Sequence, residues 1–166
     1  MRGWLSGAFL ILAMLGSYQS QVWAQDGTSE LKSAPEWAED GRNKLAVFVG
    51  LTDAAGDLGP SLGIDYEYRF TRLFGLGGTI EYTGADLRES LVVVTFDWHT
   101  WREMKIFVAP GVEIEREDGT DMFVVRAGVE YGFPMGKDWE VMPTLILDFT
   151  SDNTAVVIGA SFGRSF

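Results

Sequence analysis

Apolar and polar residues alternate along almost the whole chain after residue 43. Between 62 and 70, for example, every even position carries a large apolar or aromatic side chain, whereas the odd positions carry glycine or a charged residue. A period of two places these sets on opposite faces of a β-strand. The same period predicts strands of about nine to eleven residues in eight runs: 44–51, 62–70, 74–82, 91–99, 105–115, 123–133, 139–149 and 154–166.

Short connections join these runs in sequence order. Turns are predicted at 71–72, 100–103 and 134–138, and loops at 52–60, 83–90, 116–121 and 151–153. Strands joined in this way are antiparallel neighbours, and pairing the first with the last removes both sheet edges. We therefore predict an all-β, eight-stranded antiparallel up-and-down barrel over residues 43–166.

The environment of the barrel depends on whether its apolar face points inward or outward. In a soluble, lipocalin-like periplasmic barrel that binds an apolar ligand, the apolar face would point inward. In a membrane barrel it would point toward lipid. Glycines concentrate on the polar face, where a narrow interior would need small residues beside larger ones. This distribution favours a transmembrane barrel with a polar interior.

The polar face also carries charges of both signs. Unpaired charges are costly to bury, so a narrow interior would force these residues into a network of ion pairs. We predict that such a network plugs the interior. Its expected members are Asp65, Glu67, Arg69, Glu81, Asp97, Lys105, Glu113, Arg126, Glu130 and Asp148.

Aromatic residues gather near the turns at one end of the predicted barrel, the end where the barrel domain both begins and finishes. Tryptophan and phenylalanine at one level are typical of the interfacial girdle of a membrane barrel. The alternative is that these aromatics pack in an ordinary core. The expected girdle consists of Phe70, Phe74, Trp98, Trp101, Phe133, Trp139 and Phe166.

The start of the chain has a different character. Residues 1–24 combine Arg2, a short apolar run and the small residue Ala24, which indicates a secretory signal peptide. The polar stretch 25–42 predicts a flexible periplasmic leader. Segment 1–24 holds one of the 13 basic and none of the 24 acidic residues, so the remainder carries a formal charge of −12. That charge argues against a nucleic-acid partner.

Taken together, the signal peptide, the eight amphipathic strands and the terminal Phe166 resemble the small outer-membrane β-barrels of Gram-negative bacteria. That group includes the barrel of outer membrane protein A and the outer membrane proteins X and W. The resemblance implies a location in the outer membrane, contact with its lipid, and a monomer. It also implies that the assembly machinery reads the last strand through Ile158, Phe162 and Phe166.

Three residues depart from this pattern. Arg164 occupies a position where an apolar residue is expected, so either its side chain snorkels or a bulge changes the parity. Pro110 and Pro143 fall inside strands with neighbours on both sides, where proline removes a ladder hydrogen bond. We expect a bulge near each proline.

Candidate chemistry is sparse. The chain has one histidine, His99, and no cysteine, which excludes a zinc site built from these residues. His99 lies on the polar face near Asp97, where a hydrogen-bonding role in the interior is favoured over catalysis. We therefore predict no enzyme, no metal and no cofactor. The acidic excess on the polar face keeps open a narrow cation-preferring pore as an alternative to the plug.

Overall fold

The computed structural model describes residues 42–85, 87–101, 103–115 and 121–166, with only the backbone of Trp101 and Glu115. The predicted signal peptide, and the predicted leader up to residue 41, lie outside the described residues. Among the residues described, no helix is long and apolar enough to cross a membrane. The strands are β1 (Asn43–Ala54), β2 (Asp57–Arg69), β3 (Phe74–Thr83), β4 (Glu89–Trp101), β5 (Met104–Glu115), β6 (Asp121–Tyr131), β7 (Phe133–Pro134), β8 (Trp139–Phe149) and β9 (Thr154–Ser165).

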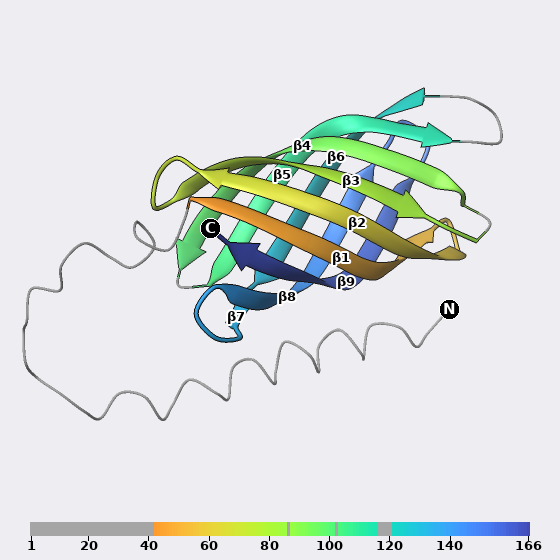
Figure 1. Cartoon of the computed structure of the whole chain (residues 1–166). Coiled ribbons are helices and arrows are strands. Elements are labelled where there is room, and N and C mark those ends of the chain that lie inside the picture. Colours follow the sequence, from red (N-terminus) through yellow and green to blue (C-terminus); the bar gives the residue numbers. More distant parts are fainter. Residues whose placement is uncertain (1–41, 86, 102, 116–120) are drawn as a thin grey trace, which may run out of the picture. The chain divides into compact units, whose positions relative to one another are not determined.

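These strands form one closed antiparallel sheet (Figure 1). The order is β6-β5-β4-β3-β2-β1-β9-β8-β7, and a further pairing of β6 with β8 closes the barrel. β6 and β7 together count as one strand of the barrel, because both pair with β8 in the same register. Glu130 pairs with Thr144, and Phe133 pairs with Val141. The predicted eight-stranded up-and-down barrel is confirmed.

The strands are strongly tilted in the barrel wall, as Figure 1 shows. The register of the ladders is staggered around the barrel. A path along paired residues that starts at Asn43 of β1 passes Phe96 and Leu147, and it returns to β1 at Asp53. A barrel can close with such a stagger only if its strands slant across the axis. The stagger also decides which interior residues from distant strands meet at one level.

We name the two ends of the barrel by residues that lie there. The Phe166 end holds Asn43, whose backbone N–H donates to the Phe166 carbonyl at 3.1 Å, and the connections between β2 and β3, β4 and β5, and β7 and β8. The Gly56 end holds the connections between β1 and β2, β3 and β4, β5 and β6, and β8 and β9.

The predicted loop at 52–60 is wrong. β1 continues to Ala54 and β2 begins at Asp57, so only two residues form the turn. Ala55 and Gly56 both have positive φ, 54° and 99°, which suits the tight hairpin turn that matches strand twist. Pro60 pairs with Leu51 inside the ladder, so the Gly- and Pro-containing sequence that indicated a loop is part of a strand.

The expected bulges at the two prolines are also wrong. Opposite Pro110 the β4–β5 ladder has a gap, yet Val93–Gly111 and Phe96–Val108 lie in the same register on either side. Pro143 keeps its pairing with Ala160 of β9, and the wall opposite it is interrupted between β6 and β7. Proline lacks the N–H that a ladder needs, so each proline removes local pairing without shifting the strand.

The apolar face of every strand points outward. Ile64 is 57% exposed and Ile80 is 65% exposed, whereas the interior residues Phe48, Thr79 and Arg126 are at most 6% exposed. A soluble barrel would have the opposite arrangement, with its large apolar side chains inside. The outer surface of the described barrel is therefore a continuous belt of large apolar side chains.

The interior is less uniformly polar than the sequence predicted. Eight inward residues form an apolar cluster, and glycines make room for the largest of them. A side chain at Gly159 would meet the ring of Phe48, and one at Gly128 would meet the ring of Phe107. The cluster consists of Phe48, Leu91, Val93, Phe107, Ala109, Val124, Ile146 and Val157.

Candidate functional site

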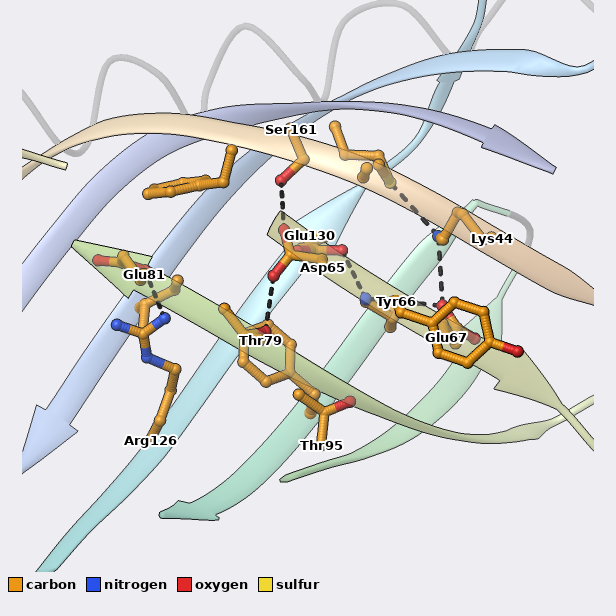
Figure 2. Close-up of a pocket in the computed structure, with 16 residues that line it drawn as sticks. Lys44, Asp65, Tyr66, Glu67, Thr79, Glu81, Thr95, Arg126, Glu130 and Ser161 are labelled. Carbon is orange, nitrogen blue, oxygen red and sulfur yellow. Dashed lines mark hydrogen bonds and ion pairs between the residues drawn. The ribbon is translucent and has the colours of Figure 1, made fainter. Parts of the chain in front are cut away.

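Arg126 of β6 crosses the interior between two carboxylates. Its Nε and Nη2 donate to the two oxygens of Asp148 at 2.7 and 2.8 Å, and its Nη1 donates to Glu81 Oε2 at 2.6 Å. Asp148 lies beside Arg126 in the β6–β8 ladder. Glu81 belongs to β3 on another part of the wall, and Figure 2 shows its side chain beside that of Arg126. All three residues are at most 5% exposed, so these ion pairs are buried in the interior.

A second network is centred on Glu67 nearer the Phe166 end. Glu67 Oε1 lies 2.5 Å from His99 Nε2 and 3.2 Å from Arg69 Nε, and its Oε2 lies 3.3 Å from Lys44 Nζ. Figure 2 shows Lys44 and Glu67 pointing toward each other. Lys44 Nζ also lies 3.2 Å from Glu140 Oε1, so the network reaches from β2 across β1 to β8.

Lys105 of β5 extends the same network around the wall. Its Nζ lies 2.8 Å from Glu130 Oε2, and 3.7 Å from both Glu67 Oε2 and Asp97 Oδ1. The last two oxygens accept no hydrogen bond from a described side chain or backbone group. At 3.7 Å these two contacts are charge attractions without a hydrogen bond.

Small cavities lie among the described residues of the barrel. One cavity of about 30 Å³ lies between the two networks, and a second of about 30 Å³ lies near Arg69 and Gly132. A third, of about 110 Å³, lies at the Gly56 end beside Glu113, Met122 and Asn153. The first two are large enough for about one or two waters each.

The structure places eight of the ten residues predicted for the interior network in these two groups of ion pairs. Asp65, outside the two ion-pair networks, accepts a hydrogen bond from Thr79 Oγ1 at 2.6 Å. Glu113 is 9% exposed and lies at the Gly56 end instead. Lys44 and Glu140 were not predicted as members, although their alternation with outward residues places both on the inner face. The eight are Glu67, Arg69, Glu81, Asp97, Lys105, Arg126, Glu130 and Asp148.

The residues predicted as a girdle lie on the outer surface at the Phe166 end. Phe74 pairs with Trp98 across β3 and β4, and Trp139 stacks on Phe162 with ring centroids 4.8 Å apart. The side chain of Trp101 lies outside the described part of the chain. The remaining predicted residues are 42–58% exposed: Phe70, Phe74, Trp98, Phe133, Trp139 and Phe166.

A second group of outward aromatics, not predicted, lies at the Gly56 end. Tyr82, Phe123 and Phe149 are 43%, 65% and 42% exposed, and each stands near the Gly56 end of its strand. Their parity in the sequence already placed them outside. Their common level could not be recognised without the stagger of the barrel.

The last strand carries the three residues predicted as an assembly signal. Ile158, Phe162 and Phe166 are exposed at 61%, 46% and 58% and share the outer face of the wall. β9 pairs with β1 on one side and β8 on the other, so this strand completes the barrel. Its recognition by assembly machinery stays a prediction.

His99 makes the interior contact that its position suggested. Its Nε2 faces Glu67 Oε1, and it lies in the wall of the second cavity among charged residues. Among the described residues, no group of three or more histidine, cysteine, aspartate or glutamate side chains could hold a metal ion.

Comparisons with known proteins bear on the fold. No family model matches the chain, and no curated protein matches it. Among solved structures, it is similar to the outer membrane protein Ail of Yersinia pestis in a phospholipid bilayer nanodisc, with a TM-score of 0.52 and 10% identity over 75% of this chain and 99% of that chain.

Two further structures are similar in the same way. The N-terminal β-barrel domain of Pseudomonas aeruginosa OprF has a TM-score of 0.50 and 14% identity, over 74% of this chain and 98% of that chain. A transmembrane β-barrel obtained by de novo design has a TM-score of 0.50 and 15% identity, over 72% and 94%. At these identities the likeness concerns the fold alone. The chain thus has the fold of the small eight-stranded outer-membrane β-barrels, with no subfamily assigned.

Proposed function

We propose that this chain is an integral protein of the bacterial outer membrane, held in lipid by its barrel wall. The observation that carries the proposal is the outward belt of large apolar side chains around a charged interior. Contiguous exposed apolar surface of this extent marks contact with a membrane or another protein. Strands of 10–13 residues, apart from the short β7, are long enough to cross a bilayer when tilted.

Cell fractionation tests this location. We expect the protein to sediment with outer membranes and to resist extraction by salt or carbonate, because lipid covers its apolar belt. On a gel, the unheated protein should migrate differently from the heated one, since a closed barrel resists detergent until it is heated. Release with the periplasmic contents, with no heat-dependent shift, would support the soluble barrel instead.

Within that location we propose a structural role with a plugged interior and without catalysis. Arg126 bridges β6, β8 and β3 through short ion pairs, and the apolar cluster occupies the same region of the interior. His99 is engaged by Glu67, which supports a bracing role for it. The proposal includes a monomer that contacts membrane lipid and is inserted by the outer-membrane assembly machinery.

Conductance measurements distinguish the plug from the alternative, a narrow cation-preferring pore. That alternative is supported by the acidic residues Glu113 and Asp148 beside the cavity at the Gly56 end. In planar bilayers, we expect the purified barrel to show no steady open conductance, because the Arg126 ion pairs and the apolar cluster occupy the described interior. Reproducible cation-selective channel openings by the wild-type protein would establish the pore and reject the plug.

A further inference from the structure

Arg164 is a charged residue on the outer wall of the barrel. On β9 it shares a face with Ile158 and Phe162, and it pairs with Leu45 of β1 and Trp139 of β8 without a change of parity. Its side chain is 55% exposed. A guanidinium therefore lies at the edge of the apolar belt, at the Phe166 end.

The surroundings hold this guanidinium in place. Trp139 is stacked on Phe162, with ring planes 19° apart, and the Arg164 Cζ lies 5.6 Å from the centroid of the Trp139 ring. The backbone N–H of Ser165 donates to the Asp138 carbonyl at 2.9 Å, which joins the turn to the last strand. The aromatic surface thus supports one face of the cation and leaves its edge accessible.

Among the described residues, the one carboxylate paired with Arg164 makes no hydrogen bond to its guanidinium. Arg164 Nη2 lies 3.7 Å from Asp138 Oδ2, which is beyond hydrogen-bond distance. Among the residues described, none makes a hydrogen bond to the guanidinium. Its fork of N–H donors suits an acceptor with paired anionic oxygens, such as a phosphate.

The charge at the two rims is unequal in a way that favours an anion at this position. Exposed residues at the Phe166 end include the basic Arg42, Arg72, Lys137 and Arg164, with the acidic Glu103. Exposed residues at the Gly56 end include the acidic Asp57, Asp121 and Asp152, with the basic Arg88. A basic rim attracts an anionic lipid surface, and this attraction is strongest within a Debye length.

We propose that Arg164, supported by Trp139, binds the phosphate of an anionic phospholipid headgroup in the leaflet at the Phe166 end. The inference rests on the proposed membrane location and adds a lipid class and a binding residue to it. The apolar belt below Arg164 would contact the acyl chains, while Lys137 contributes to the local positive field.

The test uses the full folded protein in vesicles of phosphatidylcholine, with and without phosphatidylglycerol. After mild detergent extraction, native mass spectrometry counts the phospholipids retained by each barrel. We expect wild type to retain phosphatidylglycerol in preference to phosphatidylcholine. In Arg164→Gln this preference should be about fivefold weaker, which corresponds to the loss of one basic residue at an anionic surface. Arg88→Gln, at the opposite rim, is the matched control and should retain the preference.

A heat-shift gel on the same vesicles distinguishes a failure of the proposed membrane location from a failure of the lipid site alone. If wild type does not insert, the proposed membrane location fails and this inference falls with it. If wild type inserts but retains both lipids equally, or if Arg164→Gln retains phosphatidylglycerol as wild type does, only the lipid site is rejected.

Discussion

Replacing Arg126 by methionine should lower the free energy of unfolding by about 3–5 kcal/mol, because it leaves two buried carboxylates without a counter-charge. Glu81 and Asp148 are 3% and 5% exposed, so neither can recover its hydration inside the intact barrel. Urea unfolding of the barrel in vesicles, followed by tryptophan fluorescence and by the heat-shift gel, measures the change.

Two further variants show whether the loss of stability comes from buried carboxylates that lack a counter-charge. Arg69→Met should cost at most about 1 kcal/mol, because the Arg69 side chain is 28% exposed and Glu67 keeps other cationic partners. A triple variant that replaces Arg126, Glu81 and Asp148 by apolar residues should be more stable than Arg126→Met, since it strands no charge. If the triple variant is as unstable as the single one, the ion pair is not the reason for the loss.

Introducing arginine at Ile64 should destabilise the inserted barrel by about 2–4 kcal/mol, the cost of a cation on the lipid face near the bilayer midplane. Ile64 is 57% exposed in the middle of β2 and pairs with the outward residues Val47 and Ile80. The same urea titration in vesicles measures this cost.

Leu58→Arg provides the matched control for that prediction. Leu58 is 58% exposed on the same face of β2, but it lies next to the Gly56 turn, where the new side chain can reach water. We expect a change of about 0–1 kcal/mol. In a soluble barrel both arginines would be solvated, so equal and small effects at the two positions would contradict membrane insertion.

The alternation in the sequence was sufficient to predict the barrel and the direction of most side chains. Side chains alternate with a period of two in any strand, so Glu67 and Arg126 could be placed inside, and Ile64 and Phe162 outside, without coordinates. Local composition was a weaker guide. Gly59 and Pro60 indicated a loop, but the pairing of β2 with β1 keeps them in a strand.

Arg164 illustrates an ambiguity that the sequence could not resolve. A bulge or an outward arginine would explain it equally well from the pattern alone. The ladder shows unbroken register on both sides of β9, so the side chain remains outside. Its contact with Trp139 depends on the pairing of two strands, and no alternation within one strand can specify that partner.

The barrel, its number of strands and the two faces of its wall could be predicted without coordinates, because they follow from local periodicity and short connections. The pairing of the interior charges became visible only in the folded barrel. Arg126 and Glu81 are 45 positions apart, and Lys44 of β1 meets Glu140 of β8 across β9. Such pairs depend on the stagger that carries the wall from Asn43 to Asp53 in one circuit, a property of the closed sheet that no single strand encodes.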